Sequence, residues 1–380
     1  MGLRIALDAR HIRDFGIGTY IRNLIRGLAQ IDDGNRYVLI CQQEEREQFH
    51  DLPPNFRTVA WWHTDAERID HVAFPAFLKR MHADLFHIPL NRVPWFMPRP
   101  YVVTVHDMSR QLFAGAGWRN QLSMYRARRG LMRAGKVIAV SGSTMRAAES
   151  VLGIPHEHIR RIHNAPDPRF GSPPPQGAGW PQDRQRILDR YQVNYPFILY
   201  AGNIKPQKNI PRLIEAFSVL RTELSEHEQY RDLRLIIIGD EITRHPEVRR
   251  AASQGRCLQV IRFLGYVPFD TLRAFYESAA AFAFPSLHEG FGLPPLEAMA
   301  CGTPVMTSNV SSLPEVVGDA ALTVSPDNLF EIAHGLREVL LNETLRAELI
   351  EKGYRQVRRF SWERTAREVL ETYREVLRTP

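Results

Sequence analysis

The chain has 380 residues, of which 44% are hydrophobic and 24% are charged, a composition typical of globular proteins large enough for two domains. Three scattered cysteines (Cys41, Cys257 and Cys301) argue against a disulfide framework and form no CxxC zinc pair, so we expect a reducing, cytoplasmic setting. No apolar run approaches the ~20 residues of a transmembrane helix, and the first residues lack the apolar core of a signal peptide.

Positive charge is concentrated in the first half of the chain. The net charge is +7, and residues 1–180 contain 24 Lys and Arg against 16 Asp and Glu, whereas the remainder contains 25 against 26. The stretch Met108–Ala148 carries eight basic residues and no acid, with three aromatic residues interspersed (Phe113, Trp118 and Tyr125). This pattern fits either a solvated helix face or a surface for anionic lipid headgroups.

The first half alternates short apolar runs with helical patterns. Runs bounded by breakers predict strands over Arg4–Leu7, Arg36–Cys41, Ala83–Ile88, Tyr101–Val105 and Lys136–Val140. Apolar residues at helical spacing predict a helix over Tyr20–Ala29, after a glycine-containing loop, Asp14–Gly18. Continuous apolar runs are typical of parallel strands buried on both faces.

A segment rich in proline and glycine, Pro166–Pro181, predicts the linker between two domains. The pattern then restarts, with a helix over Pro211–Arg221 and strands over Phe197–Ala201, Leu233–Gly239, Gln259–Leu264, Ala281–Phe284, Pro304–Met306 and Ala321–Val324. Residues 329–378 are predicted to be mostly helical, with a break near Phe360, where Ser361 suits the N-cap of a final helix. The two halves predict two doubly wound, parallel-sheet α/β domains with a ligand cleft at their strand ends.

The most informative stretch is residues 288–305, HEGFGLPPLEAMACGTPV. It places Glu289, a glycine loop and Glu297 directly after a predicted strand, and Pro294 or Pro295 suits the first turn of a helix. The unpaired N–H groups at the start of that helix, together with its dipole, favour an anion. A phosphate beside two carboxylates that accept hydroxyl hydrogen bonds describes a sugar nucleotide.

Two lysines follow the first strand of the second half. Lys205 and Lys208 flank Pro206 in a loop at the carboxyl end of that strand, where a lysine can neutralise a departing diphosphate. The alternative is a surface loop with ordinary lysines, and we favour a functional role for Lys208 over Lys205.

Gly16 and Gly18 lie between the first predicted strand and the first predicted helix. They predict a phosphate-binding loop, although Ile21 breaks the GxGxxG pattern of dinucleotide sites, and a turn without a ligand is the alternative. His106 directly follows the strand Tyr101–Val105, so it is expected at a ligand cleft, unless it only satisfies a local carbonyl.

No DxD motif and no cluster of residues with metal-ligand spacing appears in the sequence. We therefore expect neither a metal nor another cofactor, because helix N-termini and Lys208 can hold the diphosphate instead.

Together these residues resemble the retaining glycosyltransferases of the GT-B fold in glycosyltransferase family 4, which includes bacterial mannosyltransferases. The resemblance covers essentially the whole chain, and the E-x7-E pattern of Glu289 and Glu297 within GFGLPPLEAMACGTPV is its most specific element. The Gly16–Gly18 loop, His106 and the Lys208-Asn209 step support it.

The resemblance implies a role for each matching residue. Glu289 would bind hydroxyls of the donor hexose, Glu297 would bind the ribose, and His106 would lie beside the transferred sugar. The loop residues Gly290, Phe291, Gly292 and Leu293 would hold the diphosphate, in three cases through N–H groups (Phe291, Gly292 and Leu293). The family usually has an arginine where this chain has Asn203, so either Lys205 supplies that charge or Lys208 and the helix dipole suffice.

The resemblance also implies an overall plan. Residues 1–175 would form an acceptor-binding, Rossmann-like domain, completed by the last helix, 361–380, which would cross back onto it. Residues 185–360 would form the nucleotide-sugar-binding, Rossmann-like domain. The expected reaction moves a hexose with retention from a nucleoside diphosphate sugar, first of all mannose from GDP-mannose, to a glycan or a polyprenyl-diphosphate-linked acceptor, with the protein cytoplasmic or peripheral at the inner membrane face.

Four other functions compete with this one. A GT-B sugar-nucleotide epimerase would need no acceptor, and a phosphorylase would need pyridoxal phosphate and a far longer chain. A basic nucleic-acid-binding protein would explain the pI near 9.4, but the chain contains no known binding motif, so no nucleic-acid partner is expected. An NAD-dependent oxidoreductase is disfavoured by the broken glycine fingerprint.

Overall fold

The computed structural model describes residues 2–63, 69–112, 117–171, 179–255 and 257–378. The chain divides into two compact units, one formed by Met1–Ala165 with Phe360–Pro380 and the other by Pro166–Arg359. Among the described residues, every helix is too short or too polar to cross a membrane.

A seven-stranded parallel sheet forms the centre of the first unit within the described ranges, in the order β3-β2-β1-β4-β5-β6-β7. Its strands are β1 (Arg4–Asp8), β2 (Arg36–Cys41), β3 (Phe56–Ala60), β4 (Leu85–Ile88), β5 (Tyr101–Val105), β6 (Lys136–Ala139) and β7 (Ile159–Arg161). Its helices are α1 (Phe15–Ile31), α2 (Asp70–Arg80), α3 (Ser109–Leu112), α4 (Trp118–Met132), α5 (Gly142–Leu152) and α15 (Trp362–Arg378), with short helical turns η1 (Gln43–Phe49) and η2 (His156–His158).

The first sheet has a hydrophobic core on each face. Successive residues of a strand point to opposite faces, so Ile5 and Leu7 enter one core while Ala6 enters the other. The first core includes α1 and α15, and the second includes α2, α4 and α5. This arrangement explains why the strands have continuous apolar sequences.

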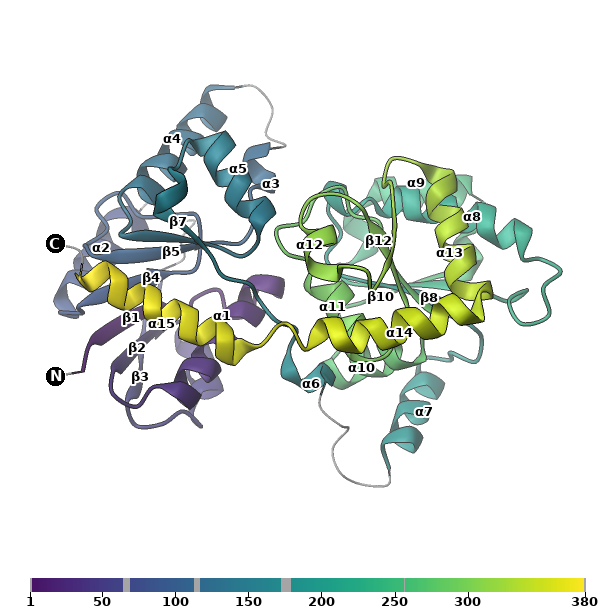
Figure 1. The fold of residues 1–380 in the computed structure, drawn as a ribbon, viewed down its shortest axis with the longest axis horizontal. Coiled ribbons are helices and arrows are strands. Elements are labelled where there is room, and N and C mark those ends of the chain that lie inside the picture. The colour runs from purple at the N-terminus through teal and green to yellow at the C-terminus, as the bar shows by residue number, and fades with distance from the viewer. Residues whose placement is uncertain (1, 64–68, 113–116, 172–178, 256, 379–380) are drawn as a thin grey trace. The chain divides into compact units, whose positions relative to one another are not determined.

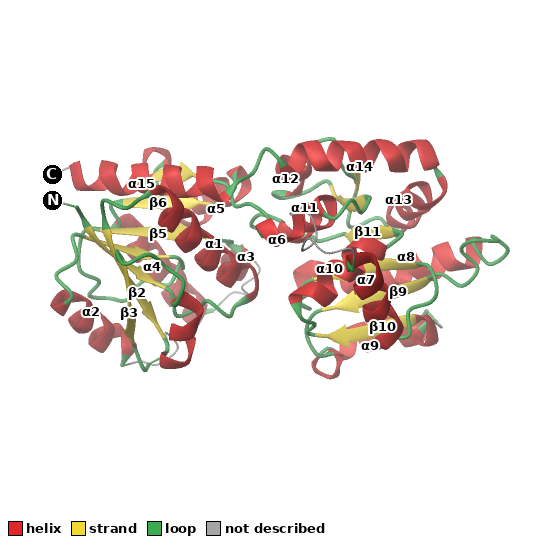
Figure 2. Cartoon of the chain, turned by 90° about the horizontal axis from the view of Figure 1, so that it is seen from below, coloured by secondary structure: helices red, strands yellow, loops and turns green. Residues whose placement is uncertain are grey.

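A six-stranded parallel sheet forms the centre of the second unit, again counting described residues, in the order β10-β9-β8-β11-β12-β13. Its strands are β8 (Phe197–Ala201), β9 (Arg234–Ile238), β10 (Ile261–Gly265), β11 (Ala281–Phe284), β12 (Val305–Ser308) and β13 (Leu322–Val324). Helices cover both faces (Figure 2): α6 (Pro168–Gly171), α7 (Trp180–Arg190), α8 (Ile210–Glu223), α9 (Pro246–Gln254), α10 (Phe269–Ser278), α11 (Leu293–Ala300), α12 (Leu313–Val317), α13 (Leu329–Leu341) and α14 (Glu343–Val357), with turns η3 (Pro206–Lys208), η4 (Ile242–Arg244) and η5 (Leu258–Val260).

The chain enters the second unit at Pro166, earlier than the boundary at residue 175 expected from the sequence. The reason is that Phe170, which is buried, packs its ring against Phe269 and Tyr276 of α10, with centroids 4.4 and 5.4 Å away. Residues 172–178 of the predicted linker lie outside the described part of the chain.

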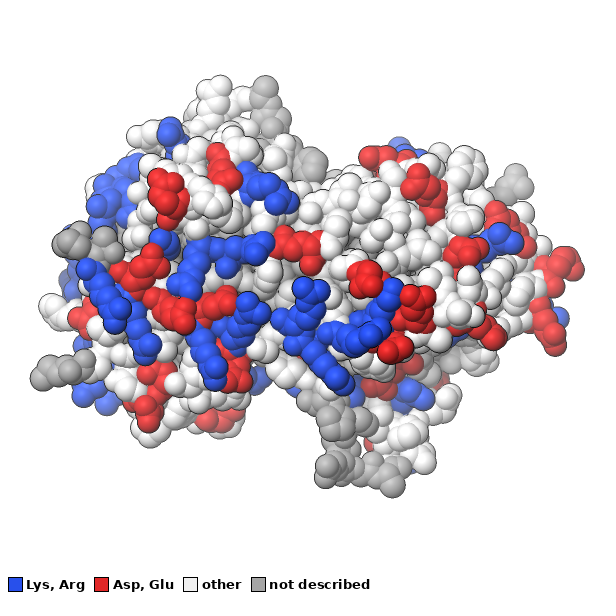
Figure 3. Space-filling model, in the orientation of Figure 1, with Lys and Arg blue, Asp and Glu red and all other residues white. Residues whose placement is uncertain are grey.

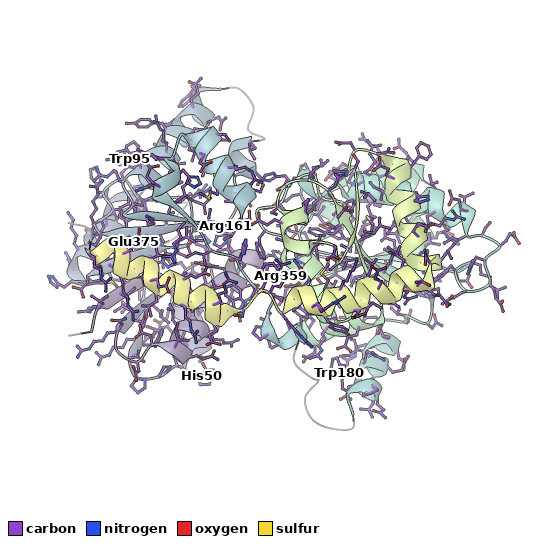
Figure 4. The ribbon with its side chains drawn as sticks, viewed as in Figure 1. His50, Trp95, Arg161, Trp180, Arg359 and Glu375 are labelled. Atoms are coloured by element: carbon purple, nitrogen blue, oxygen red, sulfur yellow. The ribbon has the colours of Figure 1, made fainter. Side chains whose placement is uncertain are left out.

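The last helix, α15, packs against α1 of the first unit (Figure 1). Its N-cap is Ser361, whose hydroxyl accepts a hydrogen bond from the Arg364 N–H at 3.1 Å. Acidic residues of α15 pair with basic residues of β6 and β7, as in Lys136–Glu375 at 2.6 Å and Arg160–Glu371 at 2.7 Å. Glu375 is labelled on α15 in Figure 4. Both signs of charge are therefore interspersed on the face drawn in Figure 3.

The basic stretch predicted from the sequence maps largely onto α4 and α5. On α4, Trp118 and Tyr125 are exposed, whereas Arg126 and Arg129 lie over the ring of Trp95, which Figure 4 labels. Lys136 is engaged by α15, and Phe113 falls outside the described residues. Among the eight basic side chains, Arg126 and Arg129 thus interact with the Trp95 ring, and Lys136 interacts with Glu375.

Candidate active site

The two loops that the sequence analysis identified as candidate ligand sites follow β8 and β11, which are neighbouring strands of the second sheet. The strand order runs backwards along the chain to β8 and forwards from β11, so the topology reverses between these neighbouring strands. Ligands of open parallel sheets bind outside the carboxyl ends of strands at such a reversal. The loop after β8 carries Lys208, and the loop after β11 carries Glu289.

Lys208 and Glu289 form a nearly buried ion pair. The lysine Nζ donates to both carboxylate oxygens, at 2.6 and 2.8 Å, and the side chains are only 14% and 10% exposed. The same Nζ lies 5.2 Å from the centre of the Phe284 ring. Lysine has three N–H donors, and each carboxylate oxygen has a second lone pair, so both groups keep the capacity to bind a further ligand.

Two serines after β12 hold the loop that carries Glu289. Ser311 accepts a hydrogen bond from the Glu289 N–H at 3.0 Å and donates to the Glu289 carbonyl at 2.6 Å. Ser312, which is fully buried, donates to the carbonyls of Glu289 and Phe291 at 3.0 and 2.7 Å. The backbone around Glu289 is therefore fixed before any ligand arrives.

Helix α11 begins directly after this loop. Gly292 is its N-cap, with φ of 107°, a conformation that side chains disfavour, and a Cβ there would lie 2.8 Å from the side chain of Leu313. Pro294 and Pro295 occupy the first turn, and no side chain caps the helix. Because proline has no N–H, the donors at this end that lack an acceptor within the helix are the N–H groups of Gly292 and Leu293, and the dipole favours negative charge there.

Glu297 lies on α11, and its carboxylate accepts a hydrogen bond from the Tyr276 hydroxyl at 3.1 Å. Burial raises the pKa of Glu297 to about 7; the Tyr276 hydrogen bond opposes the rise, Asp167 adds to it, and Arg169 also opposes it. The carboxyl therefore titrates near neutrality, where its capacity to accept hydroxyl hydrogen bonds changes with pH.

Asn203 and Lys205 lie in the same loop after β8 as Lys208, but neither of their side chains pairs with Glu289. The Asn203 side-chain oxygen is buried and finds no hydrogen-bond partner among the described residues, while its carbonyl accepts from the Tyr200 hydroxyl at 3.0 Å. Lys205 is exposed. Of the two lysines, only Lys208 reaches Glu289.

His106 lies in the first unit, at the carboxyl end of β5. Its Nε2 atom is buried and without a partner within the described part of the chain. Burial lowers the pKa of His106 to about 4, against the opposing effects of Asp107 and of a hydrogen bond to the backbone of Pro89. Because the bond to Pro89 occupies the other ring nitrogen, a neutral His106 presents Nε2 as an acceptor.

The glycines Gly16 and Gly18 are not in a loop, as the sequence predicted, but in the first turn of α1. The helix begins at Phe15, five residues before the predicted start. Gly18 is required for packing, because a Cβ there would lie 2.2 Å from the Ile12 carbonyl oxygen, and Gly16 is exposed. The predicted helix start was wrong because an apolar period cannot detect a helical turn whose side chains are small or exposed. The phosphate-binding role of these two glycines stays a prediction.

Sequence reasoning did not find Tyr276, Ser311 and Ser312 as supports of the site. Tyr276 follows a helical apolar pattern and was indistinguishable from a core residue, although its hydroxyl reaches Glu297. The pair Ser311-Ser312 precedes a helix, which in sequence resembles an ordinary cap. In the described ranges, no three His, Cys, Asp or Glu side chains are placed to share a metal ion.

Two family models match successive parts of the chain. Residues 16–170 match the model described as Glycosyltransferase Family 4, and residues 183–356 match the model described as Glycosyl transferases group 1. The chain belongs to glycosyltransferase family 4. The two matched parts correspond closely to the two sheet-containing units.

Curated relatives of this family 4 member include mannosyltransferases of Escherichia coli. The chain is 36% identical over 189 residues to the O-antigen chain mannosyltransferase B, covering 50% of this chain and 48% of that protein. It is 30% identical over 310 residues to the serotype-specific mannosyltransferase WbdA, covering 78% of this chain and 36% of that protein. The chain thus spans about half or less of the length of these relatives.

Solved structures identify the fold. The Anabaena protein HepE, solved in complex with UDP-glucose, superposes with a TM-score of 0.77 and 18% identity, covering 98% of this chain and 99% of that one. With further glycosyltransferase neighbours, this similarity gives the family 4 member a GT-B fold of two parallel-sheet α/β domains, as the resemblance implied.

Proposed function

We propose that this protein is a retaining glycosyltransferase that moves a hexose from a nucleoside diphosphate sugar to a hydroxyl of a glycan or lipid-linked glycan. The observation that carries the proposal is the Lys208–Glu289 ion pair at the strand-order reversal, just ahead of the N-terminus of α11. A cation, a carboxylate and an uncapped helix end are the groups that a diphosphate and a sugar require together.

Each site residue has a proposed part in binding the donor. Lys208 contacts the diphosphate, the loop Gly290–Leu293 holds it through backbone N–H groups, and Glu289 accepts hydroxyl hydrogen bonds from the hexose. Glu297 binds the ribose hydroxyls. In the first unit, His106 accepts a hydrogen bond from the transferred sugar through Nε2, for which the described residues provide no partner.

In the proposed reaction, the acceptor hydroxyl attacks the anomeric carbon from the face that the diphosphate leaves. The bond from that carbon to the phosphate oxygen breaks, the bond to the acceptor oxygen forms, and the acceptor proton moves to a phosphate oxygen. Lys208 and the N-terminus of α11 stabilise the charge that develops on the leaving group. Since these groups supply the charge, we expect EDTA to leave the rate unchanged.

GDP-mannose is the donor that we propose first, because the curated relatives named above are mannosyltransferases. UDP-glucose is the main competitor, since HepE was solved with it. A thermal-shift screen of nucleoside diphosphates and their sugars separates these donors. A ligand at 100 times its dissociation constant stabilises the protein by ~2.7 kcal/mol, an easily measured shift.

The decisive experiment is a transfer assay with the donor found in that screen. Formation of an α-linked product, with release of the nucleoside diphosphate only in the presence of an acceptor, supports the proposal. Epimerisation of the donor without an acceptor would instead indicate a sugar-nucleotide epimerase. Binding of RNA with a steep salt dependence, and of no nucleotide sugar, would indicate a nucleic-acid-binding protein.

The acceptor part of the proposal places the surface of Met108–Ala148 against an anionic membrane at the inner face. Exposed Trp118 and Tyr125 on α4, among arginines, support this. We expect the protein to sediment with anionic but not neutral vesicles at low salt, and Trp118→Ser to weaken this binding. Tyr266→Ser, which removes a similarly exposed aromatic residue from the second unit, is the control. Equal retention by both kinds of vesicle would contradict the membrane role.

A further inference from the structure

A chain of buried hydrogen bonds crosses the first unit from its last helix toward His106. The Tyr373 hydroxyl of α15 lies 2.6 Å from His87 Nδ1, and His87 Nε2 lies 2.8 Å from the Thr104 hydroxyl. The Thr104 hydroxyl lies 3.0 Å from that of Tyr20 on α1. All four side chains are fully buried, and they come from four different elements.

The chain can be satisfied without any charged group. Burial lowers the pKa of His87 to about 3, so the ring is neutral and provides one donor and one acceptor. Either tautomer of His87 allows the three links to form, with all hydrogen bonds running in one direction or the other. In either direction the three links hold the four side chains in the same positions.

Tyr20 ends this chain and lies against His106. The two rings meet edge to face, with centroids 4.7 Å apart and planes at 77°. On its other sides, the Tyr20 ring contacts the rings of His87 and Trp362, at 6.4 and 6.0 Å. A hydrogen bond to the backbone of Pro89 is a second contact that orients the His106 ring, so the edge of Tyr20 and this bond together determine how the ring lies.

We infer that Tyr20 is a positioning residue for His106, and that Tyr373 of α15 fixes Tyr20 through His87 and Thr104. The inference rests on the proposed function, in which His106 lies beside the transferred sugar. It gives α15 a role beyond packing: the helix that completes the first unit also sets the direction in which His106 presents Nε2.

The test compares three single substitutions in the full-length protein. Tyr373→Phe cuts the chain at α15 without altering any group near the substrate, and Tyr20→Phe cuts it at the other end while keeping the ring. Tyr101→Phe is the matched control, because it removes another buried tyrosine hydroxyl, bonded to the Gly130 carbonyl at 2.7 Å, from the opposite end of β5.

Two readouts are measured for each variant. The first is the ¹⁵N shift of the His106 imidazole in histidine-labelled protein without donor, assigned with His106→Gln. The second is the separate effect on kcat and on the dissociation constant of the donor. We expect Tyr373→Phe and Tyr20→Phe to move the His106 signals and to lower kcat roughly two- to tenfold, the equivalent of one lost hydrogen bond, with donor affinity unchanged. Tyr101→Phe should change neither.

The outcomes separate the inference from the function on which it rests. If His106 signals in both chain variants match those in Tyr101→Phe, the inference is wrong, whatever the activity. If the signals move but kcat does not, His106 is not positioned for the reaction, and the inference is also overturned. If the wild-type protein transfers no sugar, the proposed function fails while the shift measurement still reports on the chain.

Discussion

At the scale of single residues, Lys208 and Glu289 depend on each other. Each is the counterion of the other, and each is almost enclosed. Removing one partner of a buried ion pair leaves an uncompensated charge, at a cost of about 3–5 kcal/mol. Substitutions here therefore combine a loss of stability with a loss of chemistry, and the two have to be measured separately.

Lys208→Ala should lower turnover by a factor on the order of 10²–10³, as removal of one donor from an oxyanion site does. The reason is that Lys208 would stabilise the charge developing on the leaving diphosphate. The measurement is kcat at saturating donor, on protein shown by circular dichroism to be folded.

Lys205→Ala is the control for that experiment, since Lys205 is exposed in the same loop and does not reach Glu289. It should retain most of the activity. The double variant Lys208→Met/Glu289→Gln lacks both charges of the ion pair. Its free energy of unfolding should be higher than that of Lys208→Ala, while its turnover stays low. Full activity of Lys208→Ala would reject the catalytic role of this lysine.

Glu297 should make the protein less stable as pH rises. Its folded-state pKa of about 7 lies above the ordinary value of 4.5, because burial disfavours the charged form. Between those values the unfolded chain loses the proton first, so the free energy of unfolding falls as pH rises through this window and stays lower above it. Glu297→Gln should therefore raise the melting temperature more at pH 8 than at pH 4.

Glu351→Gln controls for the loss of a carboxylate, because Glu351 is 73% exposed on α14. It should alter the melting temperature little at either pH. The same Glu297→Gln substitution should weaken donor binding at pH 8 in the proposed function, since it removes a charged acceptor of ribose hydroxyls. If Glu297→Gln changes the melting temperature by the same amount at pH 4 and at pH 8, the pKa of Glu297 is not raised.

At the scale of elements, the start of α11 depends on one backbone conformation. Gly292 turns the chain from the Glu289 loop into the helix with a positive φ, and Leu313 packs against it where a side chain would be. The loop and the helix N-terminus are thus one structural piece, fixed further by Ser311 and Ser312. The turn at Gly292 therefore also sets the direction of the N–H groups at the start of α11.

Gly292→Ala should destabilise the second unit by about 1–3 kcal/mol, the usual cost of a residue held in a disfavoured backbone conformation. It should also weaken binding of a bare nucleoside diphosphate, which is measured by calorimetry. Gly171→Ala is the control, because a Cβ at Gly171 would meet no atom within 4 Å. Unchanged binding by Gly292→Ala would argue against a diphosphate at this helix end.

Elements with a clear hydrophobic pattern could be predicted from the sequence. The strands Arg36–Cys41, Tyr101–Val105, Phe197–Ala201 and Ala281–Phe284 were predicted with the bounds that the structure gives. The edge strands β3 and β7 were missed: β7 has only three residues, two of them arginines, and β3 buries little beyond its first residue. Neither strand contains the continuous apolar run that is typical of parallel strands buried on both faces.

The candidate site could be predicted only in part. The loop placement of Lys208 and Glu289 follows from the order of strands and loops, but their ion pair depends on two segments 81 positions apart. Tyr276 and Tyr20 act through contacts that no local pattern records, because a tyrosine in an apolar helix face has the same sequence signature whether or not its hydroxyl is used. The raised pKa of Glu297 is likewise a property of burial in the fold.

At the scale of the whole molecule, the first unit is discontinuous in sequence. The chain leaves it at Ala165 and returns at Phe360, after the whole second unit. The core of this unit consists mainly of residues from the first 165 positions. Residues of α15, among them Trp362, Leu370 and Tyr373, complete it. The first unit therefore cannot be described, or tested, as an N-terminal fragment.

Leu370→Ala should destabilise the first unit by about 2–5 kcal/mol, the usual cost of such a cavity, and leave the second unit unaffected. Hydrogen exchange measured by mass spectrometry should show faster exchange in β1, β4 and β5 but not in β8 or β11. Leu340→Ala, at an equally buried position of α13, should give the reverse pattern. Equal effects of Leu370→Ala on both units would contradict this division of the chain.

The return of the chain at Phe360 has a consequence for biosynthesis. The ribosome completes residues 166–359, a contiguous folding unit, before it produces α15. During translation the earlier sheet therefore has one apolar face covered by α1 but not yet by α15. Nascent chains of this protein should be most prone to aggregate in that interval, and a chaperone that binds exposed hydrophobic surface would find its target along the side of α1 that α15 finally covers.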